Sequence, residues 1–217
     1  MQENNKRACG ALFIVNVALR LLVICAFIAA LVATVNYITK DKILLNARQA
    51  TAKALSDIYG ADGMIFSVAE DGGYAVLDAD GTPLGTCESE PLEAPLDDID
   101  AVYTIRKGDG EVFGYCVETS PMCFKAEVGV LVAVNPDGTA REVQIISLKE
   151  TKGIGDKVMQ SDYLDKFRKR SDGFSDNPAE MKELVIAGAT RTSEPVTIAV
   201  DTALRQIEAL TKGGNEA

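Results

Sequence analysis

The longest run of hydrophobic residues lies near the start of the chain, at residues 11–37, "ALFIVNVALRLLVICAFIAALVATVNY". As a helix this run extends about 40 Å, enough to cross the hydrocarbon layer and both headgroup zones of a bilayer. It is longer than the hydrophobic region of a cleaved signal peptide, and no clear cleavage site precedes the charged "TKDK" segment that follows it. We therefore predict a retained transmembrane helix over 11–37 behind an N-terminal tail of residues 1–10.

Basic residues flank this run on both sides, so the excess of positive charge that usually marks the cytoplasmic side does not fix its orientation. Arg20 interrupts the run, but Leu21 to Tyr37 nearly span the hydrocarbon core alone. Arg20 is then within reach of the headgroups on the N-terminal side, and the sequence gives it no further role.

Residues 38–60 keep a helical period, which predicts a stalk helix that ends at Gly60. From Met64 the pattern changes to short strand-like runs, at 63–70, 74–87, 101–118 and 125–150. Three Asp-Gly turns, "DADG", "KGDG" and "NPDG", lie within these runs, and Asp-Gly between apolar segments is a strong hairpin signal. The pattern predicts a mostly antiparallel sheet.

The C-terminal third is expected to be helical at two places. A short helix is predicted over 161–170, opened by Ser161 and Asp162, and a polar loop over 171–183. An apolar strand, "LVI", is expected at 184–186. The final helix is predicted to begin with Ser193 as its N-cap and Pro195 in its first turn. Its buried stripe would contain Val196, Ala199, Ala203, Ile207 and Leu210. The fold class is α+β: one transmembrane helix, a stalk helix, and a strand-rich domain closed by a C-terminal helix.

Composition excludes several kinds of chemistry. The formal net charge is −10 and no basic, aromatic-rich stripe appears, which argues against nucleic-acid binding. The chain has no histidine, which removes the usual general base and the usual zinc ligand. Its five cysteines show no CxxC pair, and no acidic turn has full calcium-loop spacing, so we expect no metal site and no disulfide framework. Any redox chemistry would then belong to an organic cofactor.

Two loops stand apart from ordinary turns. The first, "ETKGIGDK" at 150–157, follows a predicted strand, and the second, "AGATRTS" at 187–193, leads into the last helix. The start of a helix presents free backbone N–H groups and the positive end of the helix dipole, which together suit a phosphate. Small residues at 187–189 let a bulky ligand approach the backbone. Taken alone, such a loop is more often structural than ligand-binding.

The order and spacing of "ETKGIGDK" and "GATRTS", behind one transmembrane helix, resemble the FMN-binding domain family. Within it the layout is similar to the G subunit of the Rnf electron-transport complex, a relative of the C subunit of the sodium-pumping NADH:quinone oxidoreductase. In that family the loops usually read E-T-P-G-L-G and D-x-x-(S/T)-G-A-T. Here Lys152 replaces the proline, Leu184 the aspartate and Ala187 the serine or threonine.

The resemblance implies a role for each matched residue. Thr190 would carry FMN through a phosphoester bond installed by a separate flavin transferase. Gly188 and Ala189 would let the flavin approach, and Thr192 and Ser193 would donate hydrogen bonds to its phosphate. The first loop would cover the flavin ring, and Lys157 or Lys152 would place positive charge beside it. The first-loop residues concerned are Glu150, Thr151, Gly153, Ile154 and Gly155.

The function implied by the resemblance is electron relay within a membrane-bound ferredoxin:NAD oxidoreductase that pumps Na⁺ or H⁺. Residues 61–217 would form an FMN-binding domain outside the cytoplasm, in contact with other subunits, and the chain would turn over no substrate alone. Two alternatives stay open: a scaffold or assembly subunit of the same complex without flavin, and a single-pass extracytoplasmic binding or sensor module.

Overall fold

The computed structural model describes residues 2–70, 72–91 and 95–213. Met1 of the predicted tail and residues 71, 92–94 and 214–217 of the predicted domain lie outside the described residues. The chain forms two compact units, residues 1–47 and 48–217.

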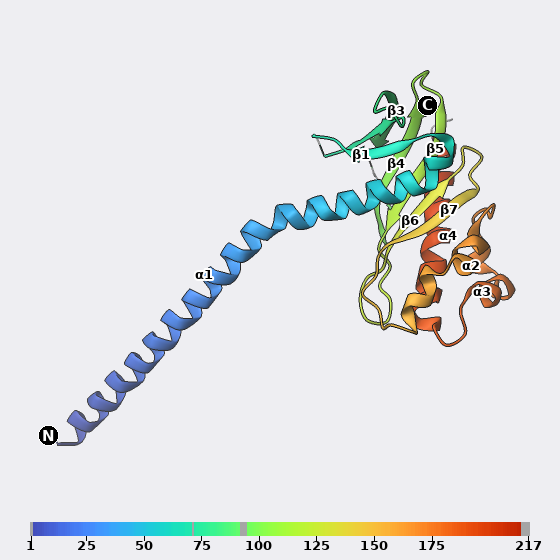
Figure 1. The fold of residues 1–217 in the computed structure, drawn as a ribbon. Helices are drawn as coiled ribbons and strands as arrows, with labels where there is room; N and C mark the ends of the chain where they lie inside the picture. The colour runs from blue at the N-terminus through green and yellow to red at the C-terminus, as the bar shows by residue number, and fades with distance from the viewer. Residues whose placement is uncertain (1, 71, 92–94, 214–217) are drawn as a thin grey trace. The chain divides into compact units, whose positions relative to one another are not determined.

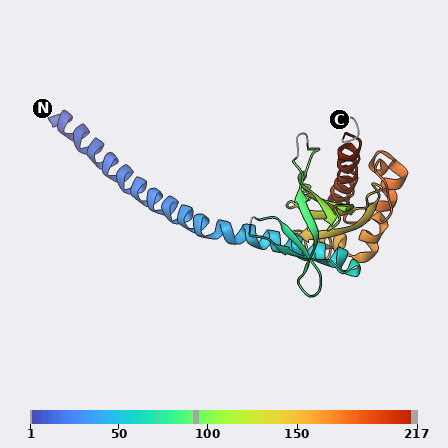
Figure 2. The same cartoon turned by 90° about the horizontal axis from the view of Figure 1, so that it is seen from above.

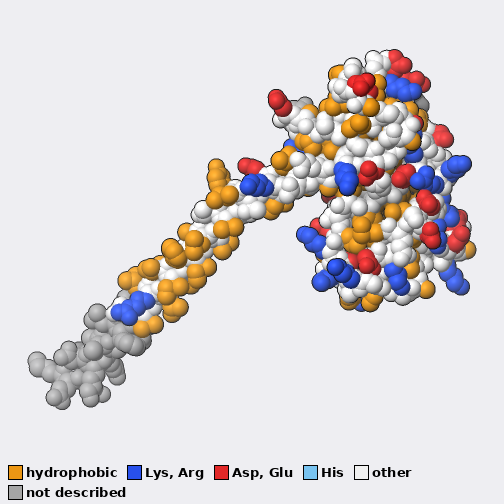
Figure 3. All heavy atoms as spheres, in the orientation of Figure 1, with side chains coloured by type: hydrophobic (Ala, Val, Ile, Leu, Met, Phe, Trp, Pro, Cys, Tyr) orange, Lys and Arg blue, Asp and Glu red, His pale blue; other side chains and the backbone are white. Residues whose placement is uncertain are grey.

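A single uninterrupted helix, α1 (Gln2–Tyr59), contains both the predicted transmembrane helix and the stalk helix. Within the described residues it is the one helix long and apolar enough to cross a membrane, with a mean hydropathy of 2.5 over its best window. Its leucine, valine, isoleucine and phenylalanine side chains between residues 17 and 38 are exposed, as the orange surface along the helix shows (Figure 3). Such a surface needs apolar cover, so the helix is consistent with a membrane anchor.

Residues 48–217 are built on one seven-stranded antiparallel sheet whose strands follow chain order (Figure 1). Its strands are β1 (Ile65–Val68), β2 (Tyr74–Leu77), β3 (Pro83–Ser89), β4 (Ile99–Lys107), β5 (Val112–Thr119), β6 (Gly129–Val134) and β7 (Ala140–Ser147). The three Asp-Gly turns close the hairpins β2–β3, β4–β5 and β6–β7, as predicted. Their glycines, Gly81, Gly110 and Gly138, have φ of 83°, 87° and 84°, which explains why glycine stands there.

The sheet is covered on both faces, by helix α4 (Thr190–Gly213) on one and by the C-terminal end of α1 on the other (Figure 2). In β6, Val130, Val132 and Val134 belong to the core beneath α4, whereas Leu131 and Ala133 belong to the core beneath α1. A strand buried on both faces needs an unbroken apolar sequence, and "GVLVAV" supplies one. The central strands thus hold the two helical layers together.

Short helical turns connect β7 to α4. They are η2 (Gly155–Met159), α2 (Ser161–Leu164), η3 (Asp165–Phe167), η4 (Phe174–Asp176) and α3 (Pro178–Leu184). The predicted helix at 161–170 is present only over 161–167, as α2 and η3, and it begins without a side-chain cap from Ser161 or Asp162. The polar loop predicted over 171–183 is wrong in part, because Asn177 caps α3 by accepting from the amide of Ala179.

Two further expectations for this region are wrong. The "LVI" segment is no strand: Leu184 ends α3, and its side chain is buried in the core beneath α4. Helix α4 begins at Thr190, three residues before the predicted N-cap Ser193, so that Pro195 lies inside it. Burial of the predicted stripe is confirmed for Val196, Ala199, Ala203 and Ile207, and Leu210 is partly buried.

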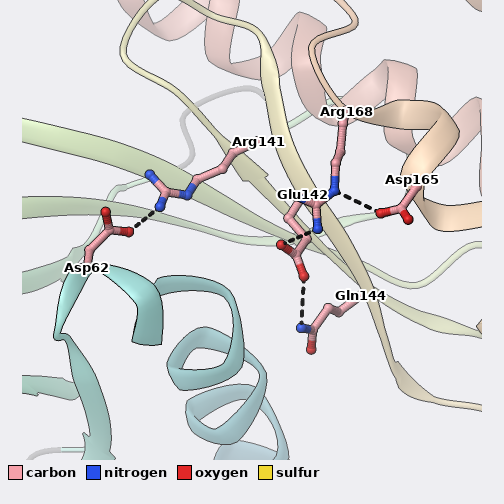
Figure 4. Close-up of polar contacts among 6 residues, drawn as sticks. All are labelled: Asp62, Arg141, Glu142, Gln144, Asp165 and Arg168. Carbon is pink, nitrogen blue, oxygen red and sulfur yellow. Dashed lines mark hydrogen bonds and ion pairs between the residues drawn. The ribbon is translucent and has the colours of Figure 1, made fainter. Parts of the chain in front are cut away.

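Ion pairs fasten the covering elements to β7 (Figure 4). Arg168 bridges Glu142 of β7 and Asp165 of η3, at 2.9 and 2.8 Å. Arg141 pairs with Asp62, just beyond α1, and its guanidinium lies 4.7 Å from the centre of the Tyr59 ring. These contacts are at the surface, and each adds little to stability.

Asp201 of α4 makes a more consequential contact. Its buried carboxylate accepts from the amide of Gly173 at 2.6 Å and from the hydroxyl of Ser175, and it pairs with Arg205 at 3.0 Å. We expect Asp201→Ala to lower the free energy of unfolding by about 2–4 kcal/mol, because it removes a buried acceptor and leaves the part-buried donors of Gly173 and Ser175 without a partner. Denaturant unfolding of the full-length protein in detergent measures this. The exposed Lys182→Ala serves as control, and equal effects of the two substitutions would contradict the account.

Candidate functional site

The structure brings the two predicted loops together around one pocket of about 360 Å³. Eight of the ten predicted residues line it, all except Gly153 and Ser193, and two unpredicted residues complete the wall. The lining residues are Phe124, Glu150, Thr151, Ile154, Gly155, Gly188, Ala189, Thr190, Arg191 and Thr192. The pocket is therefore made by loops that lie before and after the helical turns α2 to α3 in the sequence.

A tight turn, residues 186–189, forms the second loop. The amide of Ala189 donates to the carbonyl of Ile186 at 3.0 Å, and Gly188 has φ of 81°, where glycine is favoured. The carbonyl of Ala189 then accepts from the amides of Thr192 and Ser193, at 3.0 and 2.9 Å. These two bonds begin α4 directly after the turn and place Thr190 and Arg191 in its first turn.

Ser193 locks this arrangement from inside the protein. Its buried hydroxyl accepts from the amide of Ile186 at 2.9 Å and donates to the carbonyl of Ala189 at 3.1 Å. The phenol of Tyr163 donates to the Ser193 carbonyl at 3.0 Å, and burial raises the pKa of Tyr163, which keeps the phenol protonated. Ser193 thus holds the turn and does not line the pocket.

Thr190 and Thr192 occupy different positions in the wall. Thr190 is exposed, whereas only 3% of Thr192 is accessible. The amides of Thr190 and Arg191 belong to the first turn of α4, where a backbone N–H has no acceptor within its own helix. The site therefore offers an accessible hydroxyl beside free donors and the positive end of a helix dipole.

The first loop is fastened to the segment before β6. The Glu150 carboxylate accepts from the amides of Lys125 and Ala126, at 2.8 and 3.4 Å. Gly155 packs so closely on Glu150 that an added Cβ would lie 2.5 Å from the Glu150 Cβ. Gly153 has open space around it and a φ of 80°, so glycine there serves the backbone conformation.

Phe124 and Arg191 are the lining residues that the sequence did not reveal. The Arg191 guanidinium lies 5.0 Å from the centre of the Phe124 ring, a cation–π arrangement. Lys152 and Lys157, proposed to bring positive charge to the ring, do not line the pocket. Neither do Leu184, buried in the core, and Ala187 in the turn.

Cys123 lies next to the site, with its thiol 3.6 Å from the carbonyl oxygen of Thr192. Burial, reinforced by the negative charge of Glu150, raises the pKa of this thiol to about 12. It is therefore protonated at neutral pH and a poor nucleophile. Cys25, Cys87, Cys116 and Cys123 are free thiols among the described residues.

Comparison with known proteins places these features in a family. Residues 124–205 match the FMN-binding domain, and residues 12–58 match the RnfG N-terminal region. The G subunit of the proton-translocating ferredoxin:NAD⁺ oxidoreductase complex of Clostridium ljungdahlii is 30% identical over 51% of this chain and 62% of its own length. The G subunit of the Na⁺-translocating complex of Acetobacterium woodii is 30% identical over 51% of this chain and 50% of its own.

The crystal structure of Shewanella oneidensis NqrC aligns with a TM-score of 0.39 at 20% identity, over 56% of this chain and 69% of that one. The chain spans 62% and 50% of the lengths of the two curated relatives. The residues that match the FMN-binding domain thus follow an apolar N-terminal helix. That N-terminal segment is of the RnfG type, and the chain is a distant homologue of the G subunit of the Rnf complex.

The close approach at Gly155 gives a test of how the first loop is held. We expect Gly155→Ala to lower the free energy of unfolding by about 1–3 kcal/mol, since the added methyl group must displace Glu150 from its amide donors. Gly60→Ala is the control, because a Cβ at Gly60 meets nothing within 4 Å. Denaturant unfolding measures both variants. If Gly155→Ala left the free energy of unfolding unchanged, Gly155 would not be packed against Glu150.

Proposed function

We propose that this protein carries FMN on Thr190 through a phosphoester bond and relays electrons within an ion-translocating ferredoxin:NAD oxidoreductase complex. The observation that carries the proposal is the convergence of both loops on one pocket with an accessible Thr190 hydroxyl in its wall. The FMN-binding domain match covers Phe124, Thr190 and the loop at 150–155, which supports flavin as the ligand.

The lining residues fit the parts of FMN. A volume of about 360 Å³ lies within the usual range for cofactor pockets, roughly 300–1,000 Å³. Phe124 and Ile154 offer apolar contact to a planar ring, and Gly155 and Gly188 allow close approach of the backbone. The free amides of Thr190 and Arg191 would receive the phosphate at the start of α4.

Bound flavin accepts and passes on electrons one or two at a time, and the protein supplies its attachment and surroundings. Thr190 would contribute the ester oxygen and lose its hydroxyl proton. A separate flavin transferase would move the FMN phosphoryl group from a flavin dinucleotide and release the nucleoside monophosphate. Ser193 and Tyr163 would keep the attachment point fixed, because they hold the turn and the first turn of α4. No side chain has to act as an acid or base for electron transfer, which agrees with a chain that lacks histidine.

The proposal extends to location and partners. Helix α1 would anchor the protein in the membrane, with the FMN-binding domain outside the cytoplasm, and would pack against transmembrane helices of other subunits. The two curated relatives are named as subunits of proton- and Na⁺-translocating complexes, which supports membership of such an assembly. The coupling ion differs between those relatives, so it stays open for this chain.

Substitution of the attachment residue tests the proposal. After co-expression with a flavin transferase, intact-protein mass spectrometry should find one added FMN on the wild type and none on Thr190→Ala. Thr202→Ala, which removes a hydroxyl nearer the C-terminus of the same helix, should keep the flavin. Because Thr190 is exposed, we expect Thr190→Ala to change the free energy of unfolding by less than about 0.5 kcal/mol.

Other outcomes would contradict the proposal in distinct ways. A Thr190→Ala variant with undiminished flavin would place the attachment elsewhere. A wild type that joins the complex without flavin would indicate a scaffold role. A colourless wild type with no associated partner proteins would favour a binding or sensor module.

A further inference from the structure

We propose that Arg191, held on the ring of Phe124 in the pocket wall, is the cation that favours the reduced state of the flavin. This inference rests on the proposed function and extends it to the control of the reduction potential. It replaces Lys152 and Lys157 in that role, since neither lies in the wall of the pocket.

Two features place Arg191 in the wall of the pocket. Its backbone lies in the first turn of α4, next to Thr190, and its guanidinium lies 5.0 Å from the centre of the Phe124 ring. The segment that carries Phe124 is itself fastened, because the amides of Lys125 and Ala126 donate to Glu150 of the first loop. Arg191 and Phe124, both exposed, thus lie together in the wall of the pocket.

The balance of charge in the pocket favours Arg191 as an active cation. Glu150 and Arg191 are the two charged residues among those that line it. The Glu150 charge is met by two amide donors, whereas within the described part of the chain no carboxylate forms an ion pair with Arg191. Asp98 and Glu194 line a neighbouring cavity with Arg191 but form no ion pair with it, so its positive charge is available to a ligand in the pocket.

The charge that reduction adds to a flavin also favours a role for Arg191. Each electron that enters the pocket adds one negative charge unless a proton follows it, and a fixed cation nearby stabilises that charge. At a partly exposed site a unit charge a few ångström away changes the equilibrium between oxidised and reduced flavin on the order of tenfold. Dissolved salt should weaken the effect, because it screens exposed charges.

The reduction potential of the bound flavin tests the inference. Full-length protein would be flavinylated by a co-expressed transferase, and flavin absorbance would be titrated against an electrode at low and high salt. Arg191→Met, which removes the charge, should lower the potential by the equivalent of about tenfold in the equilibrium constant at low salt. Arg191→Lys should restore most of the potential. Lys182→Met removes an exposed cation that does not line the pocket, and it should leave the potential unchanged.

Phe124→Leu provides a second measurement, because it keeps the charge and removes the ring on which the guanidinium lies. It should lower the reduction potential by less than Arg191→Met does. The titration reads only flavin-bearing molecules, so incomplete loading of a variant does not distort it. A flavin-bearing wild type whose potential matches that of Arg191→Met would overturn this inference alone. A wild type without flavin would overturn the proposed function and this inference together.

Discussion

The turn that begins helix α4 is the constraint on which the site depends. One carbonyl, that of Ala189, accepts from the amides of Thr192 and Ser193 and from the hydroxyl of Ser193. The same hydroxyl accepts from the amide of Ile186, so both ends of the turn meet at a single buried oxygen. Ser193 is buried in this arrangement, whereas Thr190, the first residue of α4, is exposed. The buried Ser193 hydroxyl thus holds the backbone turn from which the exposed Thr190 follows.

The sheet gives this turn a fixed base. Helix α4 lies against β5 and β6 through a stripe that includes Val196, Val200 and Leu204. The first loop follows β7, the neighbour of β6, and Glu150 ties it to the segment that precedes β6. Both walls of the pocket are thus held against the same sheet, the first loop directly after β7 and the second through α4. A cofactor that exchanges electrons gains from such a base, because little structure has to rearrange on reduction.

The sequence predicted the fold best where a local signal and the tertiary structure agree. The prediction of the Asp-Gly hairpins was correct because these turns need a residue with positive φ, which glycine adopts readily. The strand at "LVI" was wrong because a short apolar run fits a buried helix end as well as a strand, and Leu184 ends α3 in the core. The start of α4 was placed too late because Ser193 resembles an N-cap, while its hydroxyl bonds to residues of the preceding turn. For the site, the two loops were found by their resemblance to a family, but Phe124 and Arg191 were not, since only tertiary structure brings residue 124 to the start of α4.

The central claim is that Thr190, and no other hydroxyl of this turn, carries the flavin. Trypsin cleaves after Lys182 and Arg191, so the peptide "ELVIAGATR" contains Thr190 as its one hydroxyl residue, and Thr192 and Ser193 fall in the next peptide. Mass spectrometry of a digest of the flavinylated full-length protein reads the position of the cofactor directly. We predict that the FMN mass is found on the peptide 183–191. FMN on the peptide 192–205, or on neither of the two peptides, would contradict the claim.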